Sequence, residues 1–260
     1  MDFRYYEMPE DRNLRVLDAV IRLYTEQAEP VSSAAVSLEL QHRWSASTVR
    51  NVFKELDELG WLHQPHSSSG RVPTDLGYRI YVEQVLSRSM RRVFWDEQLR
   101  SHLDLQTAAL FPLIAQAVEL LSRLSHVLGV SLLVVSSAGE RPGGEVHITG
   151  INELLEQPEF QDPGRLKVLI HLLDNAAPFD HYLRRLADSP GRIRLRIGQE
   201  NTMSGLDHFS VVTTRIDRSA ESALMALLGP VRMEYPLVLG AMGSLVRLLH
   251  CGSDEAQTWS

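Results

Sequence analysis

The sequence has little that would stabilise it outside a reducing compartment or anchor it in a membrane. Its one cysteine, Cys251, cannot form an intrachain disulfide. Its longest apolar runs, such as VLGVSLLVV at residues 127–135, are too short to cross a bilayer. The opening MDFRYYEMPEDR has no apolar core of the kind that signal peptides contain. We therefore expect a cytoplasmic protein with no membrane partner.

The motifs of catalysis and metal binding are also missing. The ten histidines include no HxxxH, HExxH or Cys–His arrangement with the spacing of metal ligands. Ser136 and Ser137 precede Ala138 and Gly139 without forming the GxSxG turn of hydrolases, and no glycine-rich phosphate loop is present. We expect a protein that is not an enzyme, with no catalytic residues, no cofactor and no metal site.

The charge is divided unevenly along the chain. The formal net charge is −7, which by itself argues against a nucleic-acid partner. Residues 43–92, however, hold eight Lys and Arg against five Asp and Glu, a net +3 that leaves −10 for the remainder. A locally basic module on an acidic body is the arrangement that a DNA-binding protein with a separate regulatory domain would have.

Three short helices are predicted in the first 60 residues. Apolar residues at spacings of three and four predict a helix over 13–25, and a cap at Ser32 or Ser33 begins a second over 34–43. STVRNVFKELDELG, residues 47–60, repeats the helical period and ends at a glycine. The tight turn between the second and third helices indicates a helix-turn-helix.

The exposed face of the third helix has side chains suited to DNA. With its apolar stripe turned inward, Arg50, Asn51 and Lys54 lie outside together with Ser47 and Thr48. Arg suits guanine, Asn suits adenine, and small hydroxyls suit phosphate. The alternative is an ordinary solvated helix face, and the helix alone does not decide between the two.

A predicted hairpin follows that helix directly. WLHQ (61–64) and RVP (71–73) are typical of short strands, and PHSSSG between them is typical of a turn. We expect a wing whose tip presents phosphate-binding groups; these are His66, Ser67, Ser68, Ser69, Gly70 and Arg71. Arg71 could enter a minor groove or pair with a phosphate. The alternative is a plain serine-rich turn. Thr74 is then expected to cap a helix over 75–87, in which Tyr78 and Tyr81 pack the domain.

The rest of the chain predicts an α+β body. Residues 99–128 carry a long apolar seam that Pro112 should interrupt, and we expect it to form a two-fold dimer interface. Four strands are expected, at 130–137, 145–150, 192–201 and 209–217, with helices at 165–175, 180–189 and 236–250 on one side of the sheet. Arg192, Arg194 and Arg196 alternate with apolar residues; a solvated or salt-bridged face is favoured over an anion site.

Four segments carry a resemblance to a known family. EPVSSAAV (29–36), SASTVRNVFKELDELGWLHQPHSSSGRVPTDLGYRIYV (45–82), GINELLEQPEF (150–160) and GPVRMEYPLV (229–238) are similar to the HrcA family of heat-inducible transcription repressors. The resemblance implies a dimeric repressor of chaperone genes that binds an inverted repeat, the CIRCE element, and needs the chaperonin GroEL to hold its active fold. The DNA-binding residues it implies are Ser47, Thr48, Arg50 and Asn51 on the helix, with His66, Ser67, Gly70 and Arg71 on the wing.

The chain departs from the family in one place. Only AGERPGGEVHI separates VSLLVVSS from TGINELLEQPEF, where family members have an inserted dimerising domain. We therefore expect most of that domain to be absent. The expected organisation is a winged helix-turn-helix over 1–92, a helical linker and dimerisation segment over 93–128, a reduced GAF-like α+β domain over 129–252, and a disordered tail over 253–260.

Two other functions stay open at this point. A GAF-like domain often holds a small ligand. The alternative to a heat-shock repressor is therefore a transcription regulator that senses a small molecule through its GAF-like domain. A protein-interaction module, in which the acidic body docks on a chaperonin, is the third.

Overall fold

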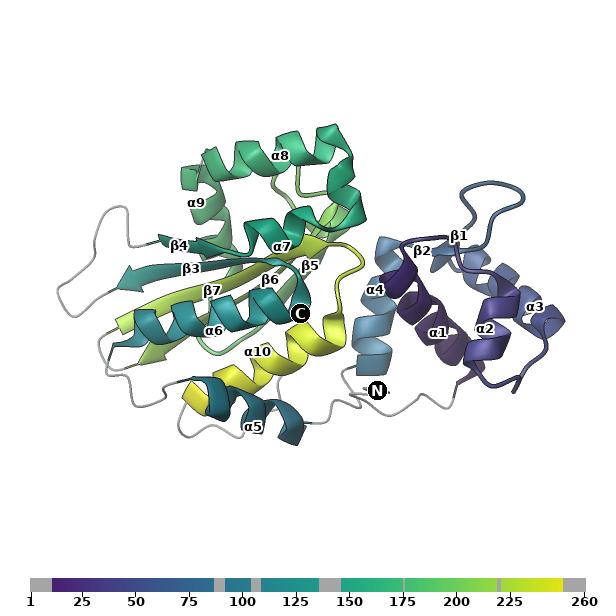
Figure 1. The fold of residues 1–260 in the computed structure, drawn as a ribbon, viewed down its shortest axis with the longest axis horizontal. Coiled ribbons are helices and arrows are strands. Elements are labelled where there is room, and N and C mark those ends of the chain that lie inside the picture. The colour runs from purple at the N-terminus through teal and green to yellow at the C-terminus, as the bar shows by residue number, and fades with distance from the viewer. Residues whose placement is uncertain are drawn as a thin grey trace. The chain divides into compact units, whose positions relative to one another are not determined.

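The structure is a computed structural model that describes residues 11–86, 92–103, 109–135, 146–174, 176–218 and 221–249. The predicted tail, Cys251, and the turn at 140–145 lie outside these ranges. The chain divides into two compact units, Met1–Met90 and Arg91–Ser260, coloured in chain order in Figure 1. Segment 93–128, predicted as a linker, belongs to the second unit by its contacts.

The first unit holds the predicted helices and hairpin. Its elements are α1 (Arg12–Gln27), α2 (Ser33–Glu39), α3 (Ala46–Glu58), β1 (Leu62–His63), β2 (Val72–Pro73), α4 (Asp75–Ile80) and a π-helical turn (Tyr81–Leu86). Side-chain oxygens accept backbone N–H bonds at four helix starts, namely Asp11, Ser32, Ser45 and Thr74. The predicted cap at Thr74 is confirmed.

The core of this unit forms where the apolar stripes of its helices meet. The stripe of α3 is fully or almost fully buried and consists of Val49, Val52, Phe53 and Leu56. Val16, Leu17 and Val20 of α1 are also buried. Tyr78 and Tyr81 are each 1% exposed, so the prediction that they pack the domain is confirmed.

The second unit is built on a five-stranded antiparallel sheet. Its strands are β3 (Leu128–Val135), β4 (Val146–Thr149), β5 (Arg194–Ile197), β6 (Phe209–Arg218) and β7 (Glu221–Pro230), in the order β4-β3-β7-β6-β5. The predicted hairpin of β3 and β4 is confirmed. β7 was not predicted. It is the central strand and is buried on both faces, so its sequence lacks the alternation that marks a strand with one wet face.

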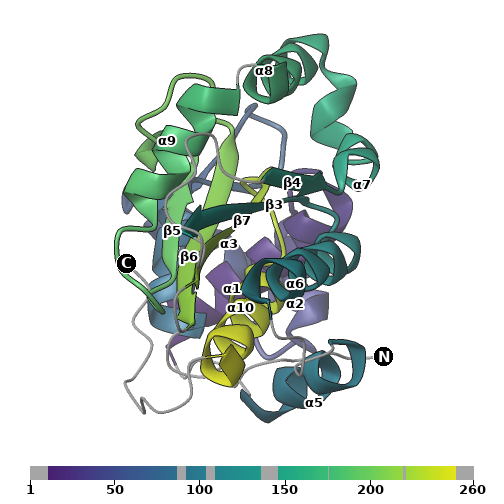
Figure 2. The ribbon, with the colours of Figure 1, turned by 90° about the vertical axis from the view of Figure 1, so that its left-hand side faces the viewer.

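Helices cover both faces of this sheet, and the expectation of helices on one side is wrong. The described helices are α5 (Arg92–His102), α6 (Leu110–Ser125), α7 (Ile151–Leu155), α8 (Pro163–Asp174), α9 (Ala176–Leu186) and α10 (Tyr235–Leu249), with 3₁₀ turns at Pro158–Gln161 and Gly198–Glu200. In Figure 2, α7, α8 and α9 lie on one face, and α6 and α10 lie on the other. The unit is therefore a three-layer α+β arrangement.

The apolar seam of residues 99–128 is covered by the chain itself. The seam residues Leu99, Leu103, Leu110, Leu113, Ile114, Ala117, Leu121 and Leu128 are all buried, and Leu124 is the exception at 47% exposed. They are buried because α6 packs on β3 and β7 while α5 packs on α10. The expectation that this seam is free to form a dimer interface is wrong.

The arginine-rich strand β5 is salt-bridged within the chain. Leu195 and Ile197 are fully buried, which confirms the predicted alternation. Arg194 lies 2.9 Å from Asp188, and Arg196 is half-buried. The favoured reading of these arginines as structural rather than anion-binding is consistent with these contacts.

Candidate nucleic-acid interface

Helix α3 presents three different surfaces beside its buried stripe. Because residues three, four and seven apart share a helix face, Arg50, Lys54 and Asp57 line one flank. Ser47, Asn51 and Glu58 form the outermost ridge, opposite the buried stripe, and all three are exposed. Thr48 and Glu55 line the other flank, and both are half-buried.

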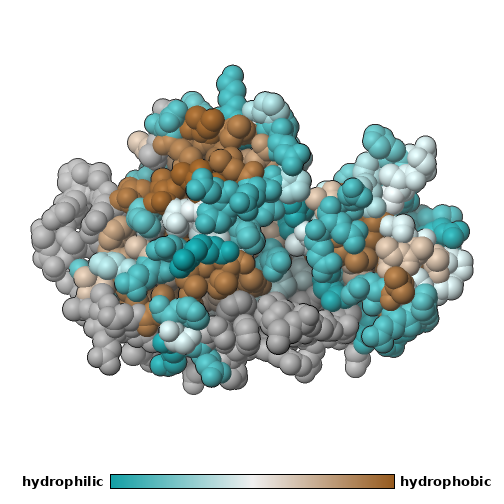
Figure 3. Space-filling model, in the orientation of Figure 1, coloured by the Kyte–Doolittle hydropathy of each residue, from teal (hydrophilic) through white to brown (hydrophobic). Residues whose placement is uncertain are grey.

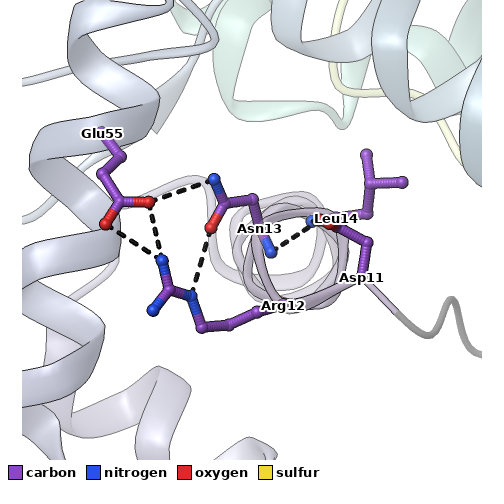
Figure 4. Close-up of polar contacts among 5 residues, drawn as sticks. All are labelled: Asp11, Arg12, Asn13, Leu14 and Glu55. Atoms are coloured by element: carbon purple, nitrogen blue, oxygen red, sulfur yellow. Dashed lines mark hydrogen bonds and ion pairs between the residues drawn. The ribbon is translucent and has the colours of Figure 1, made fainter.

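The flank of Glu55 is tied to the start of α1. Figure 4 shows two α1 side chains, Arg12 and Asn13, directed at the Glu55 carboxylate. Arg12 donates to both carboxylate oxygens at 3.0 and 2.8 Å, and Asn13 donates to one of them at 3.2 Å. Asp11 accepts the backbone N–H groups of Asn13 and Leu14, which fixes the first turn of α1. These contacts hold α3 at a set position against α1.

A hydroxyl cluster fixes the first turn of α3. The Ser45 hydroxyl accepts the Thr48 backbone N–H at 3.2 Å and lies 2.7 Å from the Ser47 hydroxyl and 3.0 Å from the Thr48 hydroxyl. Ser47 stays exposed, whereas Thr48 is half-buried. Of the two predicted hydroxyl contacts to DNA, the structure thus gives Ser47 the more accessible position.

The hairpin loop, residues 64–71, is organised by its own side chains. Gln64 donates its amide hydrogens to the Ser67 and Ser69 carbonyls at 3.0 and 2.9 Å. The Ser69 hydroxyl accepts the His66 N–H and donates to the His66 carbonyl. Figure 1 shows this loop projecting past β1 and β2, with His66, Ser67 and Ser68 exposed. The loop therefore holds a defined shape in the free protein.

The base of the hairpin loop is docked on the segment before α2. Val31 and Arg71 exchange backbone hydrogen bonds of 2.9 and 2.8 Å. A Cβ built at Gly70 would lie 2.3 Å from the Val31 carbonyl oxygen and 2.7 Å from that of Pro30. Glycine is needed here because of this close backbone approach, and the approach sets the distance from the loop to α2 and α3.

Arg71 is placed differently from the prediction. It was expected at the wing tip, but the structure puts it at the base of the hairpin loop, where its side chain is only 13% exposed. Its guanidinium lies 3.3 Å from Asp57 of α3. The pairing with Val31 and the contact with Asp57 determine this position, and neither can be read from local sequence.

One cleft brings the helix and the loop together. Its volume is about 310 Å³, and its lining residues are Ser32, Ser33, Arg50, Phe53, Lys54, Gln64, Ser68, Ser69, Gly70 and Arg71. Six of these are predicted site residues, namely Arg50, Lys54, Ser68, Ser69, Gly70 and Arg71. The other five predicted residues, Ser47, Thr48, Asn51, His66 and Ser67, are not part of the lining. The predicted set is thus divided between the cleft and the surfaces around it.

Five residues of this region were not predicted as part of the site, namely Ser32, Ser33, Phe53, Gln64 and Asp57. Ser33 and Gln64 line the cleft, and Asp57 holds Arg71. Ser33 lies in EPVSSAAV, a segment singled out only for the resemblance and for its cap. Asp57 shares the α3 flank of Arg50 and Lys54 at helical spacing, and that spacing was a usable signal for it.

A second hollow lies in the second unit, between α8 and the turn at 203–205. It has a volume of about 420 Å³ and is lined by Gly164, Lys167, Val168, His171, Leu172, Pro178, Met203, Ser204 and Gly205. Ile170, Ile151 and Leu155 are exposed apolar side chains of α8 and α7. Figure 3 shows apolar surface in brown over these two helices.

Neither a metal-binding cluster nor a membrane-spanning helix is present among the described residues. Within the part of the chain that the structure describes, no three His, Cys, Asp or Glu side chains are placed to share a metal ion. No described helix has both the length and the apolar character needed to cross a membrane.

Comparison with solved structures shows that this fold recurs. A crystal structure of a hypothetical protein matches 93% of this chain and 96% of its own, with a TM-score of 0.66 and 20% identity.

Sequence comparison gives relatives that share one name. Heat-inducible transcription repressor HrcA of Moorella thermoacetica is 28% identical over 332 residues, which covers 90% of this chain and 94% of the relative. The repressor of that name from Brevibacillus brevis is 24% identical, with 92% and 96% covered. The one from Symbiobacterium thermophilum is 37% identical over 123 residues, or 47% of this chain and 36% of the relative.

The lengths of these alignments can be compared with the expectation that most of the family's inserted dimerising domain is absent. The Moorella alignment extends over 332 residues, more than the 260 of this chain, so the relative has residues without a counterpart here. Residues 131–239 match the family model described as HrcA protein C terminal domain. With this matched segment and with relatives that align over 90% and 92% of its length, the chain is similar to the HrcA family over most of its length.

Proposed function

We propose that this protein is a transcription repressor of heat-shock genes that binds an inverted-repeat, CIRCE-like DNA operator as a homodimer. The first unit is then a winged helix-turn-helix, with α3 as the recognition helix and the β1–β2 hairpin as the wing. The observation that supports this proposal most strongly is that Arg50 and Lys54 of α3 line the same cleft as Ser68 and Gly70 of the hairpin loop. A helix and a loop that share one surface can contact one duplex together.

The chemistry of α3 fits this role along its N-terminal half. Ser47 and Asn51 stand on the exposed ridge, and an Asn side chain can bond both N6 and N7 of adenine. Glu58 lies on the same ridge toward the C-terminal end, where its negative charge would oppose phosphate. Contact with DNA is therefore confined to the first turns of α3, the part of a recognition helix that reaches base edges.

A binding assay with two duplexes tests the proposal. Fluorescence anisotropy would compare an inverted-repeat duplex with a scrambled duplex of equal length and composition at the same salt concentration. We expect tighter binding to the inverted repeat and nuclease protection of both half-sites. Equal affinity for the two duplexes would refute specific repression.

Dimerisation needs a surface other than the apolar seam of residues 99–128, which is buried. A dimer would place two α3 helices about one DNA turn, or roughly 34 Å, or a multiple of it apart. Light scattering on the eluted full chain, with and without operator duplex, measures the oligomeric state. A monomer at micromolar concentration in both samples would refute the dimeric mode of binding.

The resemblance to the HrcA family also implies the chaperonin GroEL as a partner. We propose that GroEL binds this chain while it is incompletely folded, so that free GroEL raises the fraction of active repressor. Refolding the chain with and without GroEL, followed by the anisotropy assay, measures that fraction. An equal active fraction in both reactions would refute this partner.

The hollow beside α8 favours a second function, the sensing of a small molecule. Its volume of about 420 Å³ lies within the range of small-ligand pockets. Apolar Val168, Leu172 and Met203 stand beside the Lys167 ammonium, which suits a ligand with an apolar body and a carboxylate. Octanoate is a suitable probe in calorimetry. We expect saturable binding that Lys167→Gln weakens, and no binding to the unchanged protein would refute this function.

A further inference from the structure

The cleft between α3 and the hairpin loop contains a set of groups suited to one anion. We propose that it holds a single phosphate of the DNA backbone, so that Arg50 and Lys54 supply sequence-independent affinity while Asn51 and Ser47 on the ridge read bases. This inference rests on the proposed function and divides its residues into two roles. It also changes the role of Arg50, which the sequence suggested as a base-reading residue.

The direction of the Arg50 side chain is the first argument. Its Nε donates to the Ser33 hydroxyl of α2 at 3.3 Å, so the guanidinium extends from the flank of α3 across the cleft. A base-reading arginine would instead extend from the exposed ridge, where Ser47 and Asn51 stand. The hydrogen bond to Ser33 uses Nε only. The two terminal nitrogens of the guanidinium take no part in it and can donate to a phosphate in the cleft.

The charge of the lining is the second argument. Arg50 and Lys54 are both exposed and stand one helical turn apart on the same flank. Among the described residues that line the cleft there is no carboxylate. The nearby acids of α3 are each paired with a cation, Asp57 with Arg71, which also lines the cleft, and Glu55 with Arg12. An anion entering the cleft therefore meets cations without an acidic neighbour in its wall.

Hydroxyl groups complete the donor set. The Ser33 hydroxyl accepts from Arg50, which leaves its own hydrogen to donate. Ser68 is exposed on the opposite wall. Gln64 and Ser69, by contrast, use their donors within the hairpin loop. The cleft thus offers two cations from α3, one hydroxyl from α2 and one from the loop, which matches the several acceptor oxygens of a phosphate.

The walls of the cleft are held apart at a fixed distance. The Gly70 backbone rests against Val31, and Arg71 connects the loop base to Asp57 of α3. Both contacts fix the base of the loop relative to α2 and α3. A preformed cleft loses little conformational entropy on binding, which favours phosphate capture on any sequence.

Salt dependence separates the two roles. Anisotropy titrations would measure binding of the inverted-repeat and scrambled duplexes at several salt concentrations for Arg50→Ala, Lys54→Ala and Asn51→Ala. Each cation variant should weaken both duplexes by the same factor and reduce the slope of log K against log salt, and loss of both cations should reduce it by about 0.9 for the one phosphate of each half-site. Asn51→Ala should weaken only the inverted repeat, roughly 5- to 150-fold, and leave the slope unchanged.

A neutral phosphate in the duplex gives a second, chemical test. Methylphosphonate would replace one phosphate at a time along the operator. At one position per half-site, the unchanged protein should lose more affinity than Arg50→Ala or Lys54→Ala loses on the natural duplex, because the neutral phosphate removes the contacts of both cations. Each single variant should lose less from the methylphosphonate than the unchanged protein does. Arg185→Ala, which removes an exposed cation of α9 in the second unit, serves as the matched cation control and should keep the slope and the methylphosphonate profile of the unchanged protein.

The outcomes distinguish this inference from the proposed function. If Arg50→Ala lowers the ratio of specific to scrambled binding and keeps the slope, Arg50 reads a base and the inference is overturned. If the unchanged protein binds both duplexes equally but Arg50→Ala reduces the slope, the cleft holds a phosphate and the specific repressor function fails. Binding to neither duplex at low salt would overturn both.

Discussion

Arg232 and Glu159 form a mostly buried, two-pronged ion pair in the second unit. Arg232 donates to the two Glu159 oxygens at 2.5 and 3.0 Å and to the Gln157 side chain at 2.8 Å. The two side chains are 8% and 16% exposed. Residue 159 lies in GINELLEQPEF and residue 232 in GPVRMEYPLV, so two segments that resemble the HrcA family meet at this pair.

Replacing Glu159 by Gln should destabilise the second unit strongly. The change removes the charge that balances a buried guanidinium, and breaking such a pair costs about 3 kcal/mol or more. Urea unfolding of the full chain, followed by circular dichroism, measures the loss. Glu156→Gln is the matched control, because Glu156 is exposed one turn earlier, and it should change stability by less than about 0.5 kcal/mol. Equal stability of the two variants would contradict this assignment.

The Arg71–Asp57 contact should be measurable as a coupling. Unfolding of Asp57→Ala, Arg71→Ala and the double variant gives the interaction energy of the pair. We expect about 0.5 to 1 kcal/mol, near the upper end for partly exposed pairs, because Arg71 is mostly buried while Asp57 is 40% exposed. Glu58→Ala, next to Asp57 but exposed on the ridge, should show no coupling to Arg71→Ala. Additive effects at Asp57 and Arg71 would mean that the pair does not hold the loop base.

Local pattern was sufficient for the elements of the first unit. The buried stripe of α3, from Val49 to Leu56, recurs at helical spacing, and Thr74 precedes its helix in the expected capping position. The same approach missed β7, whose residues are buried on both faces and so form one apolar run without period. The same approach did not predict that the apolar residues of α5 and α6 are buried within the chain. The sheet face and α10, which cover them, come from residues far along the sequence.

The candidate site was predictable only in its chemistry. Arg50, Asn51 and Lys54 could be placed outside α3 from the helical period, and a loop after the helix could be expected from its serines and glycine. The division between ridge and flank depends on where Ser33 meets Arg50. The burial of Arg71 depends on Val31, 40 positions earlier in the sequence. Such long-range pairings have no local signal.

Gly70→Ala should displace the hairpin loop. The added methyl group would meet backbone atoms of Pro30 and Val31, which cannot turn aside as a flexible side chain can. We expect a loss of about 1 to 3 kcal/mol in stability and weaker binding to every duplex. Ser68→Ala adds no such clash, because Ser68 is exposed, and should keep the stability of the unchanged protein. A fully stable Gly70→Ala protein with normal DNA affinity would show that the close approach is dispensable.

Tyr182 should make the second unit sensitive to alkaline pH. Its hydroxyl donates to Asn201 at 2.8 Å, and the Asn201 amide in turn donates to the carbonyls of Gly198, Leu206 and Phe209. Burial raises the pKa of Tyr182 to about 12, with the Arg196 charge lowering it and the Glu200 charge raising it. The folded state therefore holds the phenol proton more tightly than the unfolded chain, whose tyrosine titrates near 10.

The sign of the effect follows from this difference. The free energy of unfolding should be insensitive to Tyr182 below pH 10 and should fall as pH rises from about 10 to about 12, because only the unfolded state then releases the proton. Tyr182→Phe should lose about 1 kcal/mol at neutral pH, since Asn201 loses a donor, and should lack this part of the alkaline decline. Urea unfolding of both proteins at a series of pH values measures the two slopes. Parallel slopes would show that Tyr182 ionises equally in both states, and the lost hydrogen bond would then be its only contribution to stability.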